Sequence, residues 1–389
     1  MAGSANAAPV ESIEHPAART RIAQREFYID RLRGVMTVLV ILHHTAITYG
    51  AMGGWFWHEI QPSRTPSSIL LVLFCSTNQA YFMGFFFLLA GYFTPASLDR
   101  KGYGKFILDR FIRLGIPILA FGLILGPLTA ALVTYAQGDG FWPTFVALWH
   151  RKEFILGPLW FAEALLIFSL WYVLRRCIGG PQPGVPDAER PAPTPVPSWR
   201  AWFIGALIVG ASALALRQVF PIGDSLFGYW AMYIFLFIVG IRARPRNWLA
   251  QLSWKQAWPW VVTAIVVWPT LPLGWVLASG KANFNTGLSW AAFLYAFWEP
   301  FIAWGLIAAW LLIFRKYLNK PSAFWDWVGR RAYAVYIIHP PVLVGIALLL
   351  HGWAAPALLK FAVVGSLAII AAWLASDPLV RLHGVRRVV

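Results

Sequence analysis

Two basic residues near the start of the chain have a spacing that suits chemistry: Arg33 and, eleven residues later, His44, in FYIDRLRGVMTVLVILHHTA (27–46). On an α-helix this spacing brings their side chains to within about 20° of one face and separates them by about 16 Å along the axis. His43 is turned about 100° from His44, and Asp30 lies one turn below Arg33. An imidazole can take a proton from a hydroxyl near neutral pH, and a guanidinium can bind phosphate. The pattern therefore predicts a base deep along a helix and an anion-binding group at the entrance of that helix.

Each of these residues also has a structural alternative. An ionisable group deep in an apolar helix disfavours membrane insertion unless it faces a polar cavity or a partner, which makes His44 a functional candidate. The alternative for His44, and more strongly for His43, is a neutral imidazole hydrogen-bonded between packed helices. Arg33 alternatively extends to the membrane surface and only marks one side of the membrane.

The composition indicates which kind of fold must position these residues. The chain has 389 residues, of which 59% are hydrophobic and only 12% charged, and its mean hydropathy is +0.61. Soluble domains have roughly a quarter charged residues, so the composition argues against a soluble fold. Apolar runs of about 20 residues match the length that crosses a bilayer. We therefore expect an all-α polytopic transmembrane bundle of about ten helices, near 35–53, 69–93, 114–136, 157–174, 201–217, 226–242, 258–277, 290–314, 332–350 and 357–377.

The distribution of positive charge predicts the orientation. The formal net charge is +16, and the basic residues cluster at the chain ends and in alternate loops. This arrangement is typical of cytosolic loops rather than of a nucleic-acid-binding surface. We therefore expect both termini in the cytosol, in a multi-pass protein of a bacterial-type cytoplasmic (inner) membrane.

The same reading divides the chain into segments. Residues 1–26 lack the apolar core of a signal peptide and are expected to form a flexible cytosolic tail. Residues 27–378 are expected to form the membrane domain, and 379–389 a basic cytosolic tail. The proline-rich stretch 179–198 is expected to be a cytosolic linker within the domain.

Five stretches resemble, in order, the signature motifs of the membrane-bound acyltransferase-3 family. The first stretch, residues 29–45, resembles the family's pattern of Arg or Lys, ten residues and His, and this spacing selects His44 over His43. The second stretch, residues 82–93, departs from the family, because Ala90 stands where Ser is usual. The start REFYIDRLR resembles the glucan succinyltransferase branch. The five stretches are IDRLRGVMTVLVILHHT (29–45), FMGFFFLLAGYF (82–93), DRFIRLGIP (109–117), GPLWFAEAL (157–165) and RAYAVYIIHPPVL (331–343).

The resemblance implies an O-acyltransferase that moves an acetyl or succinyl group from acyl-CoA to a hydroxyl of a glycan, a lipid or a secondary metabolite. Acyl-CoA is then a co-substrate, and no tightly bound cofactor is expected. His44 is the expected general base. Arg33, Arg110 and Arg113 are expected to bind the CoA phosphates, the last two from one face of a helix. Glu163 is expected to orient His44 or to contact the acceptor, or alternatively to pair with another helix.

Residues of the last motif are assigned more generally. His339 and, near Arg33, Asp30 are expected to contact substrate, although a histidine at a proline-broken helix is alternatively a packing residue. Tyr333 and Tyr336 are expected to be only packing or interface residues. No metal site is expected, because the chain has no HExxH motif and no cysteine cluster.

Two other function classes fit the same pattern of buried polar groups. A transporter or flippase for a small anion or a glycolipid would use them as a binding pathway. A structural scaffold fits less well, because it has no use for histidine and glutamate within the membrane. For an acyltransferase, direct transfer and an acyl-histidine intermediate are both open.

Overall fold

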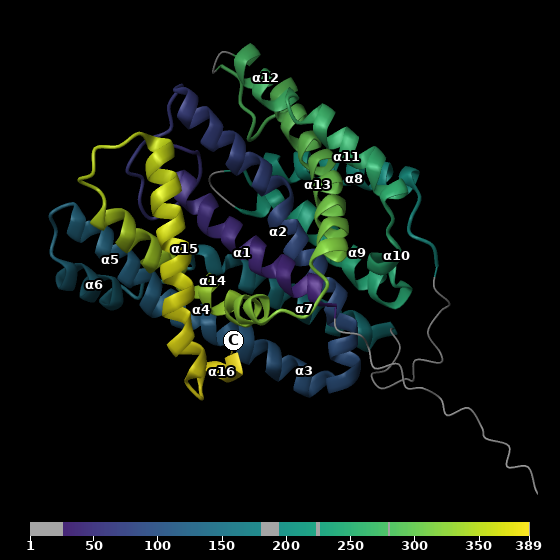
Figure 1. The fold of residues 1–389 in the computed structure, drawn as a ribbon, viewed down its shortest axis with the longest axis horizontal. Helices are drawn as coiled ribbons and strands as arrows, with labels where there is room; N and C mark the ends of the chain where they lie inside the picture. Colours follow the sequence, from purple (N-terminus) through teal and green to yellow (C-terminus); the bar gives the residue numbers. More distant parts are fainter. Residues whose placement is uncertain (1–25, 180–193, 223–225, 279–280, 389) are drawn as a thin grey trace, which may run out of the picture.

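The structure is a computed structural model that describes residues 26–179, 194–222, 226–278 and 281–388. Within these residues the chain forms helices joined by loops, and its β pairing is a single bridge between Tyr49 and Ile60. The longer helices pack into one bundle (Figure 1). The α-helices are α1 (Phe27–Thr48), α2 (Pro66–Lys101), α3 (Tyr103–Arg110), α4 (Ile116–Ala120), α5 (Gly126–Ala136), α6 (Phe141–His150), α7 (Trp160–Gly179), α8 (Trp199–Val219), α9 (Trp230–Arg246), α10 (Trp248–Gln251), α11 (Trp254–Val267), α12 (Thr270–Ala278), α13 (Trp290–Tyr317), α14 (Ala323–Leu349), α15 (Ala357–Arg381) and α16 (Val385–Val388).

Nine helical segments of the described chain are long and apolar enough to cross a membrane, and they correspond to the second to tenth expected helices. α1 is not among them, because Asp30, Arg31 and Arg33 lie in its first two turns. It is instead an interior helix, packed against α2, α13, α14 and α15. Figure 1 shows it crossing the middle of the bundle. The predicted all-α polytopic bundle is confirmed, and the helix with the candidate base lies in its interior.

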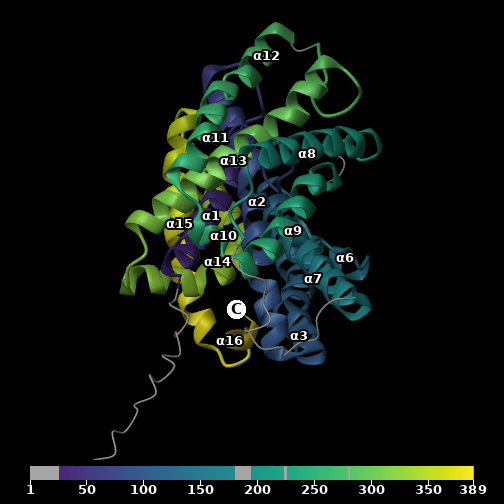
Figure 2. The same ribbon diagram turned by 90° about the vertical axis from the view of Figure 1, so that its right-hand side faces the viewer.

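The two ends of the described chain lie toward the same end of the bundle. Figures 1 and 2 both show the start of α1 and the end of α15 on the side of α3 and α16, with α12 at the opposite end. An even number of crossings places chain ends in this way, so the arrangement agrees with α1 acting as a tenth crossing.

Several helices are longer than the hydrophobic runs predicted, because caps rather than hydropathy determine where they begin and end. α2 starts where the Thr65 side chain accepts a hydrogen bond from the Ser68 amide, at 3.4 Å. It continues past the apolar run to Gly102, whose φ of 72° ends the helix. α14 similarly begins at a Ser322 cap, nine residues before the expected start at 332.

The expected terminal and linker segments are described only in part. Residues 1–25 and 180–193 lie outside the described residues. At the other end of the chain, α15 continues to Arg381 and α16 follows within the expected basic tail 379–389.

α2 and α9 approach each other most closely at two glycines. A Cβ added at Gly91 would lie 2.2 Å from the Phe237 carbonyl oxygen, and one at Gly240 would lie 2.1 Å from the Leu88 carbonyl oxygen. Small residues allow this backbone contact between membrane helices. Gly91, which belongs to the second family-like stretch, therefore has a packing role.

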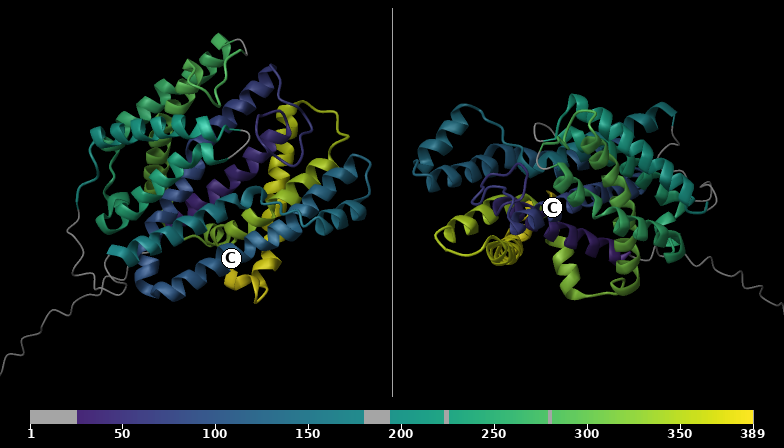
Figure 3. Two further views of the ribbon diagram at one scale, coloured as in Figure 1. Left: turned by 180° about the vertical axis from the view of Figure 1, so that it is seen from behind. Right: turned by 90° about the horizontal axis from the view of Figure 1, so that it is seen from above.

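The segment Tyr103–Ala136 is one long helix interrupted by two π-helical turns, η1 (Phe111–Gly115) and η2 (Phe121–Leu125). Each turn precedes a proline near the start of the next helical piece, Pro117 or Pro127. A proline removes one backbone donor from the helix, and a π-turn accommodates the interruption. α5 then forms with α6 a hairpin that projects from one side of the bundle (Figure 3).

Candidate active site

His44 on α1 and His339 on α14 form a hydrogen-bonded pair. The His44 Nδ1 and His339 Nε2 atoms lie 3.1 Å apart, and the two rings stack with their centroids 5.2 Å apart. The other His339 nitrogen, Nδ1, lies 2.6 Å from the carbonyl oxygen of Tyr336. His339 is only 1% exposed, so the hydrogen-bond partner of His44 is a buried ring.

The two prolines after His339 explain why that carbonyl is available. In an α-helix the carbonyl of residue 336 would accept a hydrogen bond from the amide of residue 340. Residue 340 is proline, which has no amide hydrogen, so the Tyr336 carbonyl has no helical partner. His339 lies one turn after Tyr336 and donates to this oxygen instead. The sequence HPP therefore determines the orientation of the ring.

This chain of hydrogen bonds determines the tautomer of both neutral rings. A carbonyl only accepts, so the hydrogen of His339 is on Nδ1, and its Nε2 is the acceptor. His44 must then donate from Nδ1, which leaves His44 Nε2 with a free lone pair. That nitrogen is the atom that a general base requires.

Trp55 covers one face of the His44 ring. Its indole stacks on the imidazole with the centroids 3.9 Å apart and the planes 11° from parallel. Trp55 belongs to the α1–α2 connection, which returns along the end of α1 because the Glu59 amide donates to the Thr48 carbonyl at 2.9 Å. An ion pair between Glu59 and Lys360 anchors this loop to α15. The imidazole is therefore held at its edge by His339 and covered on one face by an anchored indole.

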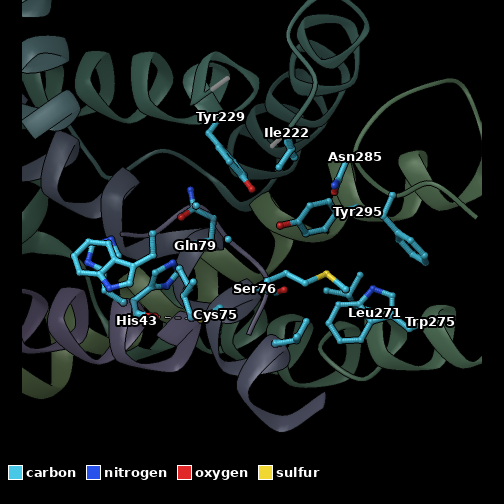
Figure 4. A pocket seen from close by; sticks show the side chains of 18 of the residues that line it. His43, Cys75, Ser76, Gln79, Ile222, Tyr229, Leu271, Trp275, Asn285 and Tyr295 are labelled. Atoms are coloured by element: carbon cyan, nitrogen blue, oxygen red, sulfur yellow. Dashed lines mark hydrogen bonds between the residues drawn. The ribbon is translucent and has the colours of Figure 1, made fainter. Parts of the chain in front are cut away.

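His43 has a different environment. Its ring stacks on Phe82 with the centroids 5.2 Å apart, and its Nδ1 is buried without a hydrogen-bond partner in the described chain. Its carbonyl accepts a hydrogen bond from the Cys75 thiol at 3.5 Å (Figure 4). Within the described residues no histidine or carbonyl hydrogen-bonds to the His43 ring, whereas His339 orients the His44 ring.

Both histidines line a cavity of about 1400 Å³. Its wall combines many aromatic rings with amide and hydroxyl side chains and two cations, and none of the described lining residues is acidic. Figure 4 shows His43 and Cys75 on one side of the cavity and Tyr295 and Trp275 on the other. The polar and aromatic lining residues include Trp55, Phe56, Ser63, Arg64, Ser76, Gln79, Trp160, Tyr229, Trp275, Lys281, Asn283, Asn285, Tyr295 and Tyr336.

The three arginines expected to bind CoA lie on α1 and on the long helix Tyr103–Ala136, at what we call the basic end of the bundle. The Arg33 side chain is 47% exposed and pairs with Asp30 at 3.8 Å. It lies close enough to Arg113 for their charges to interact. Arg110 has a buried Nε without a hydrogen-bond partner in the described chain. The structure thus gathers the predicted cations, and it places Asp30 beside them rather than in the cavity.

α14 connects the basic end to the histidine pair. The Tyr333 hydroxyl donates to the Arg113 carbonyl at 2.7 Å, and the Tyr333 and Tyr336 rings stack with their centroids 6.2 Å apart. Tyr336 lines the cavity, donates to the Pro158 carbonyl and lies next to His339. Tyr336 thus lines the cavity in addition to packing, and Tyr333 contacts the backbone of Arg113.

Glu163 is not brought to this site. It lies in the first turn of α7, is exposed, and is absent from the described lining of the cavity. His339, expected to contact substrate, lies behind His44 instead. It therefore takes the orienting position that was predicted for Glu163.

Sequence reasoning missed Trp55 and the hydrogen-bonded histidine pair. Trp55 follows two glycines in a loop and belongs to no recognisable motif. The pairing of His44 with His339 was signalled only by the two prolines after His339. No group of three His, Cys, Asp or Glu residues in the described chain is arranged to hold a metal ion.

Comparisons with known proteins agree with this geometry. A family model described as an acyltransferase domain matches residues 26–377. Curated relatives named glucans biosynthesis protein C, from Salmonella paratyphi B (strain ATCC BAA-1250 / SPB7), Salmonella agona (strain SL483) and Salmonella enteritidis PT4 (strain P125109), are each 27% identical over 241 residues. The match covers 57% of this chain and 59% of each relative, so the chain spans less than two thirds of their length. No solved structure matches the chain.

Proposed function

The chain belongs to the acyltransferase-3 family, and we propose that it is an integral membrane O-acyltransferase that transfers an acetyl or succinyl group from acyl-CoA to a hydroxyl of a glycan. The observation that carries this proposal is the fixed tautomer of His44, whose free Nε2 belongs to a ring lining a large cavity. The glycan acceptor is favoured over a lipid or a secondary metabolite by the similarity to glucans biosynthesis protein C.

His44 acts as the general base. Its Nε2 removes the proton of the acceptor hydroxyl as the oxygen attacks the thioester carbonyl. When the tetrahedral intermediate collapses, the carbon–sulfur bond breaks and the same nitrogen returns the proton to the CoA thiolate. His339 stabilises the imidazolium through the hydrogen bond that runs to the Tyr336 carbonyl. In the alternative route His44 Nε2 attacks the thioester and carries the acyl group itself.

Acyl-CoA binds at the basic end. Arg33, Arg110 and Arg113 contact its phosphates through guanidinium groups, whose fork geometry suits phosphate oxygens. The thioester then reaches His44 over about 16 Å along α1, a distance that a pantetheine arm can span. The basic end faces the cytosol, where positive residues of membrane proteins accumulate. The acceptor enters the cavity from the side of the membrane opposite the cytosol, and this membrane is a bacterial inner membrane.

The test is acyl transfer by the purified protein in detergent. Labelled acetyl-CoA or succinyl-CoA is mixed with linear gluco-oligosaccharides, and the acylated sugar is measured by mass. The proposal predicts acylated sugar with wild-type protein and none with His44→Ala. Because detergent leaves only one compartment, a transporter would consume no acyl-CoA. Folded wild-type protein that yields no acylated product would contradict the proposal.

A further inference from the structure

A second buried polar centre lies behind the cavity wall, formed by Arg217 of α8 and Glu299 of α13. The two side chains form an ion pair and are 1% and 5% exposed. Arg217 Nε also donates to the Gly228 carbonyl at 3.2 Å. The guanidinium lies 5.4 Å from the ring centre of Tyr229 and 5.0 Å from that of Tyr295. The pair is thus enclosed by two tyrosines that themselves line the cavity.

The hydrogen bonding of this ion pair is incomplete. Arg217 Nη1 and Glu299 Oε1 are buried, and neither has a hydrogen-bond partner in the described chain. A buried charged group with an unused donor or acceptor destabilises the fold. Arg217 Nη1 is the guanidinium donor that the ion pair leaves unused, and Glu299 Oε1 is the carboxylate acceptor that it leaves unused. A hydroxyl, which both donates and accepts, is the simplest group that complements the two.

The cavity surface in front of the pair has the chemistry of a sugar site. Figure 4 shows the Tyr229 and Tyr295 hydroxyls pointing toward each other at the cavity surface, with Gln79 and Asn285 nearby. Gln79 Nε2 is held by the Tyr233 hydroxyl at 2.8 Å, which fixes the orientation of its amide. Aromatic faces with a few oriented amides and hydroxyls suit a ring that has apolar faces and many hydroxyl groups.

The charge of the cavity restricts the sugar further. Arg64 and Lys281 line it, and none of the described lining residues is acidic. A cationic amino sugar would find no counter-charge there, whereas an anionic sugar would find one and a neutral sugar needs none. The site therefore fits a neutral or anionic glycan.

We propose that Tyr229, Tyr295 and Gln79, supported by the Arg217–Glu299 pair, form a sugar-binding subsite that holds one ring of the acceptor glycan while another part of that glycan reaches His44. Tyr295 lies across the cavity from His43 and Cys75 (Figure 4), whereas Gln79 lies on α2 one turn after Cys75. The proposal rests on the transfer function proposed above, and it adds that recognition of the acceptor is separate from the base. A polyol without a sugar ring reaches His44 without using the subsite.

The test compares two acceptors and two tyrosine variants. Linear gluco-oligosaccharides carry rings, and glycerol supplies a hydroxyl without a ring. The double variant Tyr229→Phe/Tyr295→Phe keeps both aromatic faces and removes both hydroxyls. It should raise KM for the oligosaccharide about 3- to 10-fold, the loss expected for one or two hydrogen bonds, and leave KM for glycerol unchanged. Tyr135→Phe, at a tyrosine that is 64% exposed, is the matched control and should change neither value.

Binding without turnover separates this proposal from the proposed function. Oligosaccharide affinity is measured by calorimetry in the His44→Ala background, with and without the two tyrosine substitutions. Weaker binding with the substitutions supports the subsite even if wild-type protein transfers no acyl group. Equal binding with and without them, or equal changes for oligosaccharide and glycerol, overturns the subsite even if transfer is observed.

Discussion

The His44–His339 pair and the Arg217–Glu299 pair are both buried and both join helices far apart in the sequence, but they differ in what they leave unpaired. In the histidine pair, hydrogen bonding accounts for every ring nitrogen except His44 Nε2. In the ion pair, one donor and one acceptor have no hydrogen-bond partner within the described residues, and both groups lie behind two tyrosines. A single free lone pair at a cavity suits proton removal, whereas a buried ion pair suits holding those tyrosine hydroxyls in place for binding. Unused hydrogen-bonding atoms within a membrane protein thus indicate which kind of chemistry each centre performs.

The comparison predicts that changes at the histidine pair lower kcat and changes near the ion pair raise the acceptor KM. The largest expected effect is that of His44→Ala. It should lower kcat about 10²- to 10⁴-fold, the usual contribution of general base catalysis, with the KM for acyl-CoA little changed. Initial rates with labelled acyl-CoA in detergent measure both constants. His43→Ala is the matched control, and an equal loss of kcat in both variants would contradict the assignment of the base.

Removing the orienting ring should have the next largest effect. His339→Ala leaves His44 free to rotate and to change tautomer, so kcat should fall roughly 10- to 100-fold, less than on loss of the base itself. A role in packing alone would not move the acid limb of the pH–rate profile, so that limb is the decisive measurement. His383→Ala, at an exposed histidine, should leave both rate and profile unchanged. A His339→Ala profile that overlays the wild-type profile would reduce His339 to a packing residue.

Changes at the basic end should affect the KM for acyl-CoA rather than the KM for the acceptor. Arg33→Ala and Arg113→Ala should each raise KM for acyl-CoA about 10-fold, the loss of a hydrogen bond to a charged group, without affecting KM for the acceptor. The wild-type KM for acyl-CoA should also rise with salt concentration, because exposed charges are screened. Arg151→Ala, at a 72% exposed arginine between α6 and α7, is the control. If Arg33→Ala and Arg113→Ala raised only the KM for the acceptor, acyl-CoA would have to bind elsewhere.

The smallest effect should be that of the stacked indole. Aromatic stacking contributes about 0.5–1.5 kcal/mol, so Trp55→Ala should lower kcat about 2- to 10-fold. Trp55→Phe, which retains an aromatic face over His44, should recover most of this loss. Steady-state rates of the two variants check the difference, and equal rates would show that stacking is not what Trp55 contributes.

The sequence predicted the features that depend on local spacing. The helical bundle followed from apolar runs, and the shared face of Arg33 and His44 followed from their separation of eleven residues. The basic cluster followed from Arg110 and Arg113, one turn apart. These predictions need no knowledge of which helices are neighbours.

Features that depend on helix packing were not predicted. The contact between His44 and His339 joins residues 295 positions apart, and it exists because α1 packs against α14. Glu163 faces outward because of how α7 packs against its neighbours, which its own sequence does not determine. The ion pair of Arg217 and Glu299 depends on contact between α8 and α13.

The most direct test of the central claim is chemical rescue of the missing base. Purified His44→Ala is assayed for acyl transfer from labelled acyl-CoA with increasing imidazole, which the cavity of about 1400 Å³ is large enough to admit. If His44 Nε2 removes the acceptor proton, imidazole restores transfer in a saturable way, and only its neutral form is effective. Wild-type rates in His44→Ala without imidazole would contradict the claim that this ring is the base.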